Sequence, residues 1–179
     1  GTSSPAYSMQ VDGSDAALFL QGSTQARLIL QDTGATSGNQ AFDIVSVSDT
    51  LKFRSLTDSR GGVNSTAMEI NHSGNVGIGV TPEAWSSTFD AIQFGDQGSI
   101  FGQNSGTQSV FGHNVYHDGA YKYITTSQAS RYVQSGGSHV WSVAPSGSAD
   151  AAISWTTAMT INNSGRVGIG TSSPTTVLQ

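Results

Sequence analysis

The sequence has no cysteine, few charged residues and no long hydrophobic run. Without cysteine, neither a disulfide framework nor a thiol nucleophile can form. Only 11% of the 179 residues are charged, and the seven basic ones are scattered between Arg27 and Arg166, so no positive face for nucleic acid is expected. The longest apolar runs, such as Leu18–Leu20, are far shorter than the ~20 residues that span a membrane as a helix. The sequence therefore predicts no nucleic-acid binding and no membrane insertion.

Apolar residues are also scarce for a chain of this length. Only 36% of the residues are hydrophobic, and 22 are glycine. Disordered chains usually combine low hydrophobicity with high charge, but here the charge is low and β-branched and aromatic residues recur at every second position. This pattern predicts an ordered β structure that takes part of its core from partner chains.

A repeated segment of thirteen residues divides the chain. Residues 67–79 (AMEINHSGNVGIG) recur at 158–170 (AMTINNSGRVGIG) with differences only at positions 69, 72 and 75 of the first copy, and we call each copy and its Ser/Thr/Pro tail a joint. Gly1–Pro5 matches the tail of a third copy. The predicted division is the end of a preceding joint (1–5), a first β module (6–66), a joint (67–83), a second β module (84–157), and a joint with the start of a next module (158–179).

Each joint is predicted to be a strand, a turn and a second strand. Apolar and polar residues alternate on either side of a turn in which Gly74 supplies a positive φ. Gly77 and Gly79 alternate with the apolar positions, which indicates that another backbone, such as that of a neighbouring copy, comes close there. In a homotrimer we expect the joints to line the axis with Met68, Ile70, Val76, Ile78, Met159, Ile161, Val167 and Ile169.

Both modules show short apolar alternations separated by turn residues rich in glycine. The fold class predicted is all-β, with short-strand β modules joined by β-hairpin joints. The strands expected lie near 16–21, 26–32, 41–48, 50–56, 91–94, 99–101, 109–111, 121–124, 131–133 and 139–143.

The joint resembles a recurrent segment of tail-fibre and appendage proteins of tailed bacteriophages. The resemblance rests on Met-x-Ile-x-x-Ser-Gly-x-Val-Gly-Ile-Gly followed by Thr-Ser-Ser-Pro, and more weakly on the second module. It implies an elongated homotrimeric fibre of these β modules and hairpin joints, which belongs to the extracellular tail fibre of a virion and carries or spaces a tip that binds the host. Many relatives continue into an endosialidase-type intramolecular chaperone, and no such segment lies before Gln179.

Catalytic and metal-binding motifs are not apparent. The acidic residues show no pairing typical of glycoside cleavage, and no nucleophile elbow or phosphate-binding loop occurs. His113 and His117 have a spacing that suits two metal ligands on a helix, but they lie in a region of strands and turns. The sequence therefore predicts a non-enzymatic chain with no cofactor and no metal site.

Aromatic residues gather in the second module, and two interpretations compete for them. They either fill a thin core in a chain short of leucine and isoleucine, or they grip sugar rings at the surface. Tyr116, Tyr121 and Tyr123 flank a His-Asp-Gly turn, so they are the residues expected to be exposed and to contact glycan.

The function expected is that of a structural shaft segment of a phage tail fibre that supports attachment to the bacterial surface. Its partners would be two further copies of the chain, neighbouring fibre segments and host glycan. The alternatives are a carbohydrate-recognition module and a shaft fragment of a polysaccharide depolymerase.

Overall fold

A computed structural model describes residues 18–38 and 40–178. This part of the chain contains no helix, and hence none that is long and apolar enough to cross a membrane. It is all-β, with strands β1 Ala26–Gln31, β2 Ala41–Val47, β3 Thr50–Leu56, β4 Val63–Asn71, β5 Val76–Ile78, β6 Phe89–Phe94, β7 Gly98–Gln103, β8 Gln108–His113, β9 Tyr116–His117, β10 Tyr121–Lys122, β11 Ser127–Ser135, β12 Ser138–Gly147, β13 Thr156–Ile161 and β14 Val167–Ile169.

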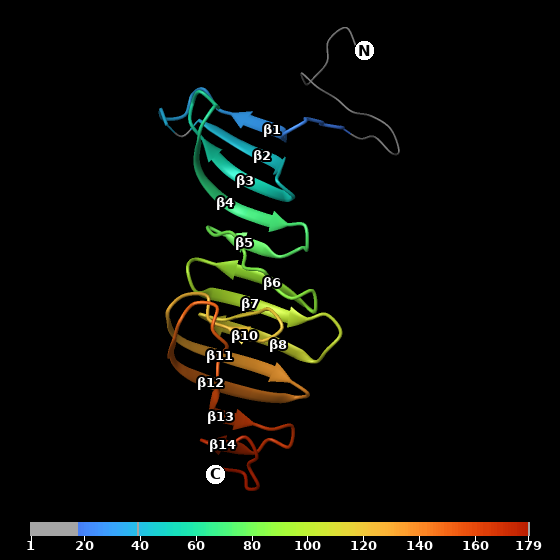
Figure 1. Ribbon diagram of the computed structural model, residues 1–179, viewed down its shortest axis with the longest axis vertical. Coiled ribbons are helices and arrows are strands. Elements are labelled where there is room, and N and C mark those ends of the chain that lie inside the picture. The colour runs from blue at the N-terminus through green and yellow to red at the C-terminus, as the bar shows by residue number, and fades with distance from the viewer. Residues whose placement is uncertain (1–17, 39, 179) are drawn as a thin grey trace.

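Twelve of the strands form a single sheet that runs the length of the molecule. Their order in the sheet follows the chain from β1 to β14, and only β9 and β10 stand apart as a small hairpin. The strands lie across the long axis and stack along it (Figure 1). All neighbours are antiparallel except β5 and β6, which are parallel. The molecule is therefore one elongated sheet whose strands lie across its long axis, and we call this sheet the ladder.

Most of the strands expected from the sequence are present. Strands β1, β2 and β3 match the predicted ranges 26–32, 41–48 and 50–56 to within one residue. The strand predicted at 16–21 is not found: residues 18–21 have no regular structure, and residues 16 and 17 lie outside the described part of the chain, as does Gly1–Pro5.

Both joints form the predicted strand, turn and strand, and their turns have the same hydrogen bonds. The Oδ1 atom of Asn71 accepts bonds from two backbone N–H groups of its turn at 3.1 and 3.0 Å, and that of Asn162 accepts the corresponding two at 3.0 Å each. Gly74 and Gly165 have φ of 85° and 74°, as a glycine in such a turn allows. The repeat in sequence is therefore a repeat in structure.

Two of the three differences between the joints have a structural reason. Glu69 forms a 2.9 Å ion pair with Lys52, whereas Thr160 at the same place in the second joint has a buried hydroxyl without a hydrogen-bond partner in the described residues. Asn75 is buried, and its Oδ1 accepts a 3.1 Å bond from the backbone N–H of Ala91 in β6. Arg166, its counterpart, is exposed. The first joint is thus adapted to hold the module that follows it.

In the second module, the chain between β8 and β11 folds over one face of the sheet. Asn114 fixes both ends of this excursion: its Nδ2 donates to the carbonyl oxygens of Thr125 and Gln128 at 3.0 Å each, and its Oδ1 accepts from the Thr125 N–H at 2.7 Å. Beneath it lies an aromatic and aliphatic core that includes Trp85 and Phe101, whose ring centroids are 4.8 Å apart. One face of this module is therefore covered by its own chain.

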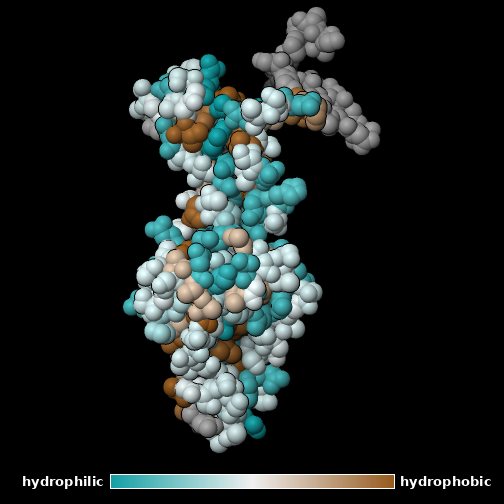
Figure 2. All heavy atoms as spheres, in the orientation of Figure 1, coloured by the Kyte–Doolittle hydropathy of each residue, from teal (hydrophilic) through white to brown (hydrophobic). Residues whose placement is uncertain are grey.

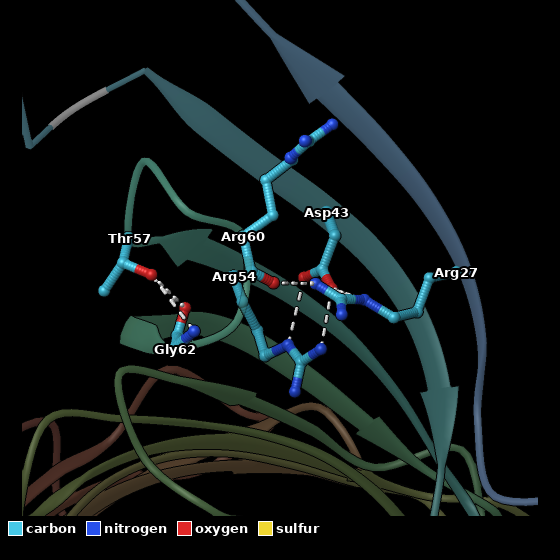
Figure 3. Close-up of polar contacts among 6 residues, drawn as sticks. All are labelled: Arg27, Asp43, Arg54, Thr57, Arg60 and Gly62. Atoms are coloured by element: carbon cyan, nitrogen blue, oxygen red, sulfur yellow. Dashed lines mark hydrogen bonds and ion pairs between the residues drawn. The ribbon is translucent and has the colours of Figure 1, made fainter.

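In the first module, ion pairs between side chains stabilise the corresponding face of the sheet. The carboxylate of Asp43 is fully buried and binds Arg27 at 2.8 Å and Arg54 at 2.6 Å (Figure 3). The hydrogen bond from Arg54, with help from Arg27, holds the pKa of Asp43 below its ordinary value. Arg27 also donates to the carbonyl oxygen of Arg60, which brings the loop between β3 and β4 against this face.

Candidate interaction surface

The opposite face of the sheet carries an apolar stripe through the first module and joint. Paired residues of neighbouring strands point to the same face, so the register fixes which side chains share it. Ile44 pairs with Leu28 on one side and Phe53 on the other. Phe53 pairs with Met68, and Met68 pairs with Ile78. A second row beside the first contains Leu51, Ile70 and Val76.

The row through Val76 continues across the second module, whereas the row through Ile78 and Phe94 passes to Gly98, His113 and Ser130. Across the parallel pair, Val76 faces Ile92 and Ile78 faces Phe94. From Ile92 the register leads through successive strands to residues of the second joint, in the order Ile100, Phe111, Tyr132, Trp141, Met159 and Ile169. We call the strand residues of this face, from β1 to β14, the stripe. It spans both modules and both joints.

Much of the stripe is exposed in the single chain. Ten large apolar residues on it are between 38% and 69% exposed: Leu28, Leu30, Phe42, Leu51, Ile78, Ile92, Ile100, Phe111, Val143 and Ile169. Figure 2 shows hydrophobic residues at several heights along a mostly hydrophilic surface. At about 150 to 200 Å² for a large side chain, half exposed, these residues present on the order of 800 Å² of apolar surface. The largest apolar patch of a typical monomer is only about 300 to 600 Å².

All eight residues predicted to line a trimer axis lie on the stripe. Met159 and Ile161 pair with Ile169 and Val167 in the second joint, as Met68 and Ile70 pair with Ile78 and Val76 in the first. Ile78 and Ile169 are exposed, and the other six are half-buried. Whether another chain covers them stays a prediction. The sequence pointed to these joint residues but not to the continuation of the stripe through the modules.

Two hollows lie along the stripe. The larger, of about 340 Å³, lies beside Gly102 and Ser109 and has Val76, Ile92 and Ile100 in its walls. The smaller, of about 230 Å³, is lined by Phe111, Ser130, Tyr132, Trp141 and Val143, among others. An apolar cavity of about 150 Å³ is enough to hold benzene, so each hollow has room for an aromatic side chain.

The three tyrosines expected at the surface do not lie there. Tyr116 and Tyr123 are buried, at 4% exposure each, and Tyr121 is half-buried. The expectation of exposure was wrong because the β9–β10 hairpin folds back over the sheet and turns these rings inward. Their hydroxyl groups donate 2.7 Å hydrogen bonds to Asp150, Gln108 and the carbonyl oxygen of Pro145. The structure thus brings all three into or against the core, as the packing interpretation held.

Arg131 lies in the same region and was not identified from the sequence. Its guanidinium is 4.4 Å from the ring centroids of both Tyr121 and Trp155. Burial lowers the pKa of Arg131, and it raises that of Tyr121. This arrangement stabilises a cation between two rings rather than exposing it to a ligand.

Gly77 and Gly168 have a close neighbour, which comes from the same chain. Nothing lies within 4 Å of a Cβ added at Gly79, so the close approach expected there is not found. A Cβ at Gly77 would collide with the carbonyl oxygen of Val80 and lie 2.8 Å from Cδ of Pro82. At Gly168 the nearest atoms belong to Thr171 and Pro174. At Gly77 the expected close approach of a backbone is therefore present, but this backbone is not that of a neighbouring copy. Each joint folds its own proline tail over its glycine.

The histidines are dispersed. His113 lies at one margin of the stripe and His117 beside Phe89, with ring centroids 4.5 Å apart. In the described part of the chain, no three His, Asp or Glu side chains gather as metal ligands.

The chain matches no protein-family model, and no curated protein is significantly similar to it.

Proposed function

We propose that this chain is a structural section of a bacteriophage tail fibre, a homotrimer that spans distance and supports attachment to the host surface. The observation that carries the proposal is the uninterrupted ladder from β1 to β14, in which each of two unequal modules is followed by a similar joint. Such an arrangement extends along one direction.

The chemistry of the described residues supports a mechanical role. Two of the ionisable groups with shifted pKa values are engaged in structure: Asp43 binds two arginines, and Tyr116 donates to Asp150. Burial and this hydrogen bond raise the pKa of Tyr116. A catalytic acid or base would need a substrate within reach, in a cleft.

The alternative of a carbohydrate-recognition module loses the residues on which it was based, because Tyr116 and Tyr123 are buried. A depolymerase shaft fragment would have the same ladder, so cleavage of host polysaccharide by the full-length protein is the outcome that distinguishes it.

Sedimentation equilibrium tests the proposal directly. A chain of 18.5 kDa should form a particle about three times that mass, and X-ray scattering should show a rod rather than a sphere. A compact monomer in solution would refute the proposal.

A further inference from the structure

We propose that the stripe is the shared core of the assembly along its whole length, formed by copies of this chain that lie parallel and in register. This inference rests on the trimer of the proposed function and adds where the chains meet. It extends the expected contact from the joints into both modules. It also assigns Phe111, Tyr132 and Trp141 to packing between chains.

The amount of exposed apolar surface fits such an interface. The ten exposed apolar residues alone offer on the order of 800 Å², which a chain in a trimer divides between two neighbours; a standard interface takes roughly 800 Å² from each partner, polar surface included. The strand residues of this face include no lysine, arginine or glutamate, and their only aspartate and histidine residues are Asp90, His113 and His139. Charged residues are depleted at the centres of interfaces, and the stripe has this composition.

The other face of the sheet cannot serve in its place. In the second module it is covered by the excursion that Asn114 holds and by the segment containing Trp85, which is buried. In the first module it holds the buried Asp43 between two arginines, one of which also binds the loop at Arg60. A partner must therefore lie against the stripe.

The length and repetition of the stripe identify the partner as another copy. It extends over twelve strands with the same paired apolar rows at both joints, and a second copy carries the same rows at the same spacing. A second copy therefore matches the full length of this surface by virtue of its own sequence. A protein of different sequence would have to reproduce that spacing over two unequal modules.

The hollows indicate the direction and register of packing. Phe111, which is 55% exposed, lies on the same strand and the same face as Ser109 at the larger hollow. When a neighbouring copy is parallel and in register, its Phe111 lies at the height of this hollow, beside Gly102. An antiparallel copy would instead place different strands at that height. The hollow is therefore a socket for the neighbour's Phe111.

Single cysteines test this arrangement, because the chain has none of its own. We expect Ile78→Cys and Ile169→Cys, each tested alone, to form disulfides between copies under mild oxidation. In a trimer, only two of the three equivalent cysteines can join in a disulfide, so about two thirds of the chains should become crosslinked. Ser87→Cys is the matched control: Ser87 is exposed in the segment that covers the opposite face, and it should remain uncrosslinked.

The outcomes separate the two proposals. A particle with the mass of one chain would refute the trimer and this inference together. A trimer in which Ser87→Cys crosslinks and the two stripe cysteines do not would overturn the inference alone. Crosslinking between Ile78→Cys and Ile169→Cys in a mixture, with neither pairing to itself, would show antiparallel packing and would also overturn it.

A second variant tests the socket without introducing charge. Ser109→Trp fills the hollow from within its own chain, so we expect the mass to fall to that of a single chain at low concentration while circular dichroism still shows β structure. Ser105→Trp, on the turn between β7 and β8, is the control and should leave the mass unchanged. An unchanged trimer for Ser109→Trp would refute the assignment of Phe111 to this hollow.

Discussion

The ring of Tyr123 packs against Gly147 and fills the space where any other residue would place its Cβ. The hydroxyl of Tyr123 donates a 2.7 Å hydrogen bond to the carbonyl oxygen of Pro145, which holds the ring in position. Gly147 is the last residue of β12. Its lack of a side chain is required by the core.

Gly147→Ala is accordingly expected to destabilise the protein by about 1 to 3 kcal/mol, the usual cost of overpacking a core. Gly61→Ala is the control, since the nearest atom to an added Cβ there is the Ser59 Oγ at 3.9 Å. Thermal denaturation of the two variants provides the comparison. Equal melting temperatures would show that Tyr123 can move aside.

Alanine at the joint glycines should have unequal effects. At Gly77 the added methyl meets the backbone oxygen of Val80, whereas at Gly168 it first meets the side-chain methyl of Thr171 at 2.7 Å, which can rotate away. We expect both variants to be destabilised and Gly77→Ala to be the worse. Chemical denaturation should give this ranking, and the reverse ranking would argue against the proline tail as the cause.

Truncation of the second-module tyrosines should cost stability. Because Tyr123 is buried and Tyr121 half-buried, Tyr121→Ala and Tyr123→Ala are expected to lose about 3 to 5 kcal/mol each. Melting curves and adsorption to host polysaccharide should be measured on the same samples. Loss of adsorption at an unchanged melting temperature would restore the glycan interpretation.

The ion pairs of Asp43 predict that the stability of the fold decreases at acidic pH. Because its folded pKa is lowered, Asp43 contributes stability at pH values above its unfolded pKa, and this stability is lost as the pH falls through the folded pKa. At neutral pH, Asp43→Asn leaves two arginines without their carboxylate and should cost about 3 to 5 kcal/mol. The gap between variant and parent should narrow below about pH 4. A gap that is constant with pH would contradict the ionised pair.

His117 should add a second acid-sensitive step at a higher pH. Burial lowers its pKa, so the unfolded chain takes up a proton before the folded one. Stability should therefore decline as the pH falls below about 6.5. His117→Gln should remove this decline and leave the Asp43 step in place, as urea titrations at a series of pH values would reveal.

Local signals in the sequence were enough for the strands and the joints. The alternation at Leu28, Phe42 and Phe53 located three strands, and the turn at Gly74 located a hairpin, because each depends on residues close in the chain. The same alternation says which residues share a face but not what covers it. In β2 the chain's own structure buries Asp43 and Val45, while Phe42 points outward.

The remaining features depend on contacts between distant residues. Tyr116 looked exposed because it precedes a turn, but the turn belongs to a hairpin that folds onto the sheet. Asn114, which fixes that hairpin through Thr125 and Gln128, is an ordinary residue in the sequence. The parallel pairing of β5 with β6, which makes two modules one sheet, leaves no local pattern at all.

The stacking of strands across the long axis has a mechanical consequence. The hydrogen bonds between strands, which lie about 4.8 Å apart, run along that axis. A force that pulls the two ends of a chain apart therefore acts along these hydrogen bonds, and it breaks the bonds between one pair of strands after another. Each opened residue would release up to roughly 3.3 Å of slack. A single ladder under tension should thus yield in many small steps at low force.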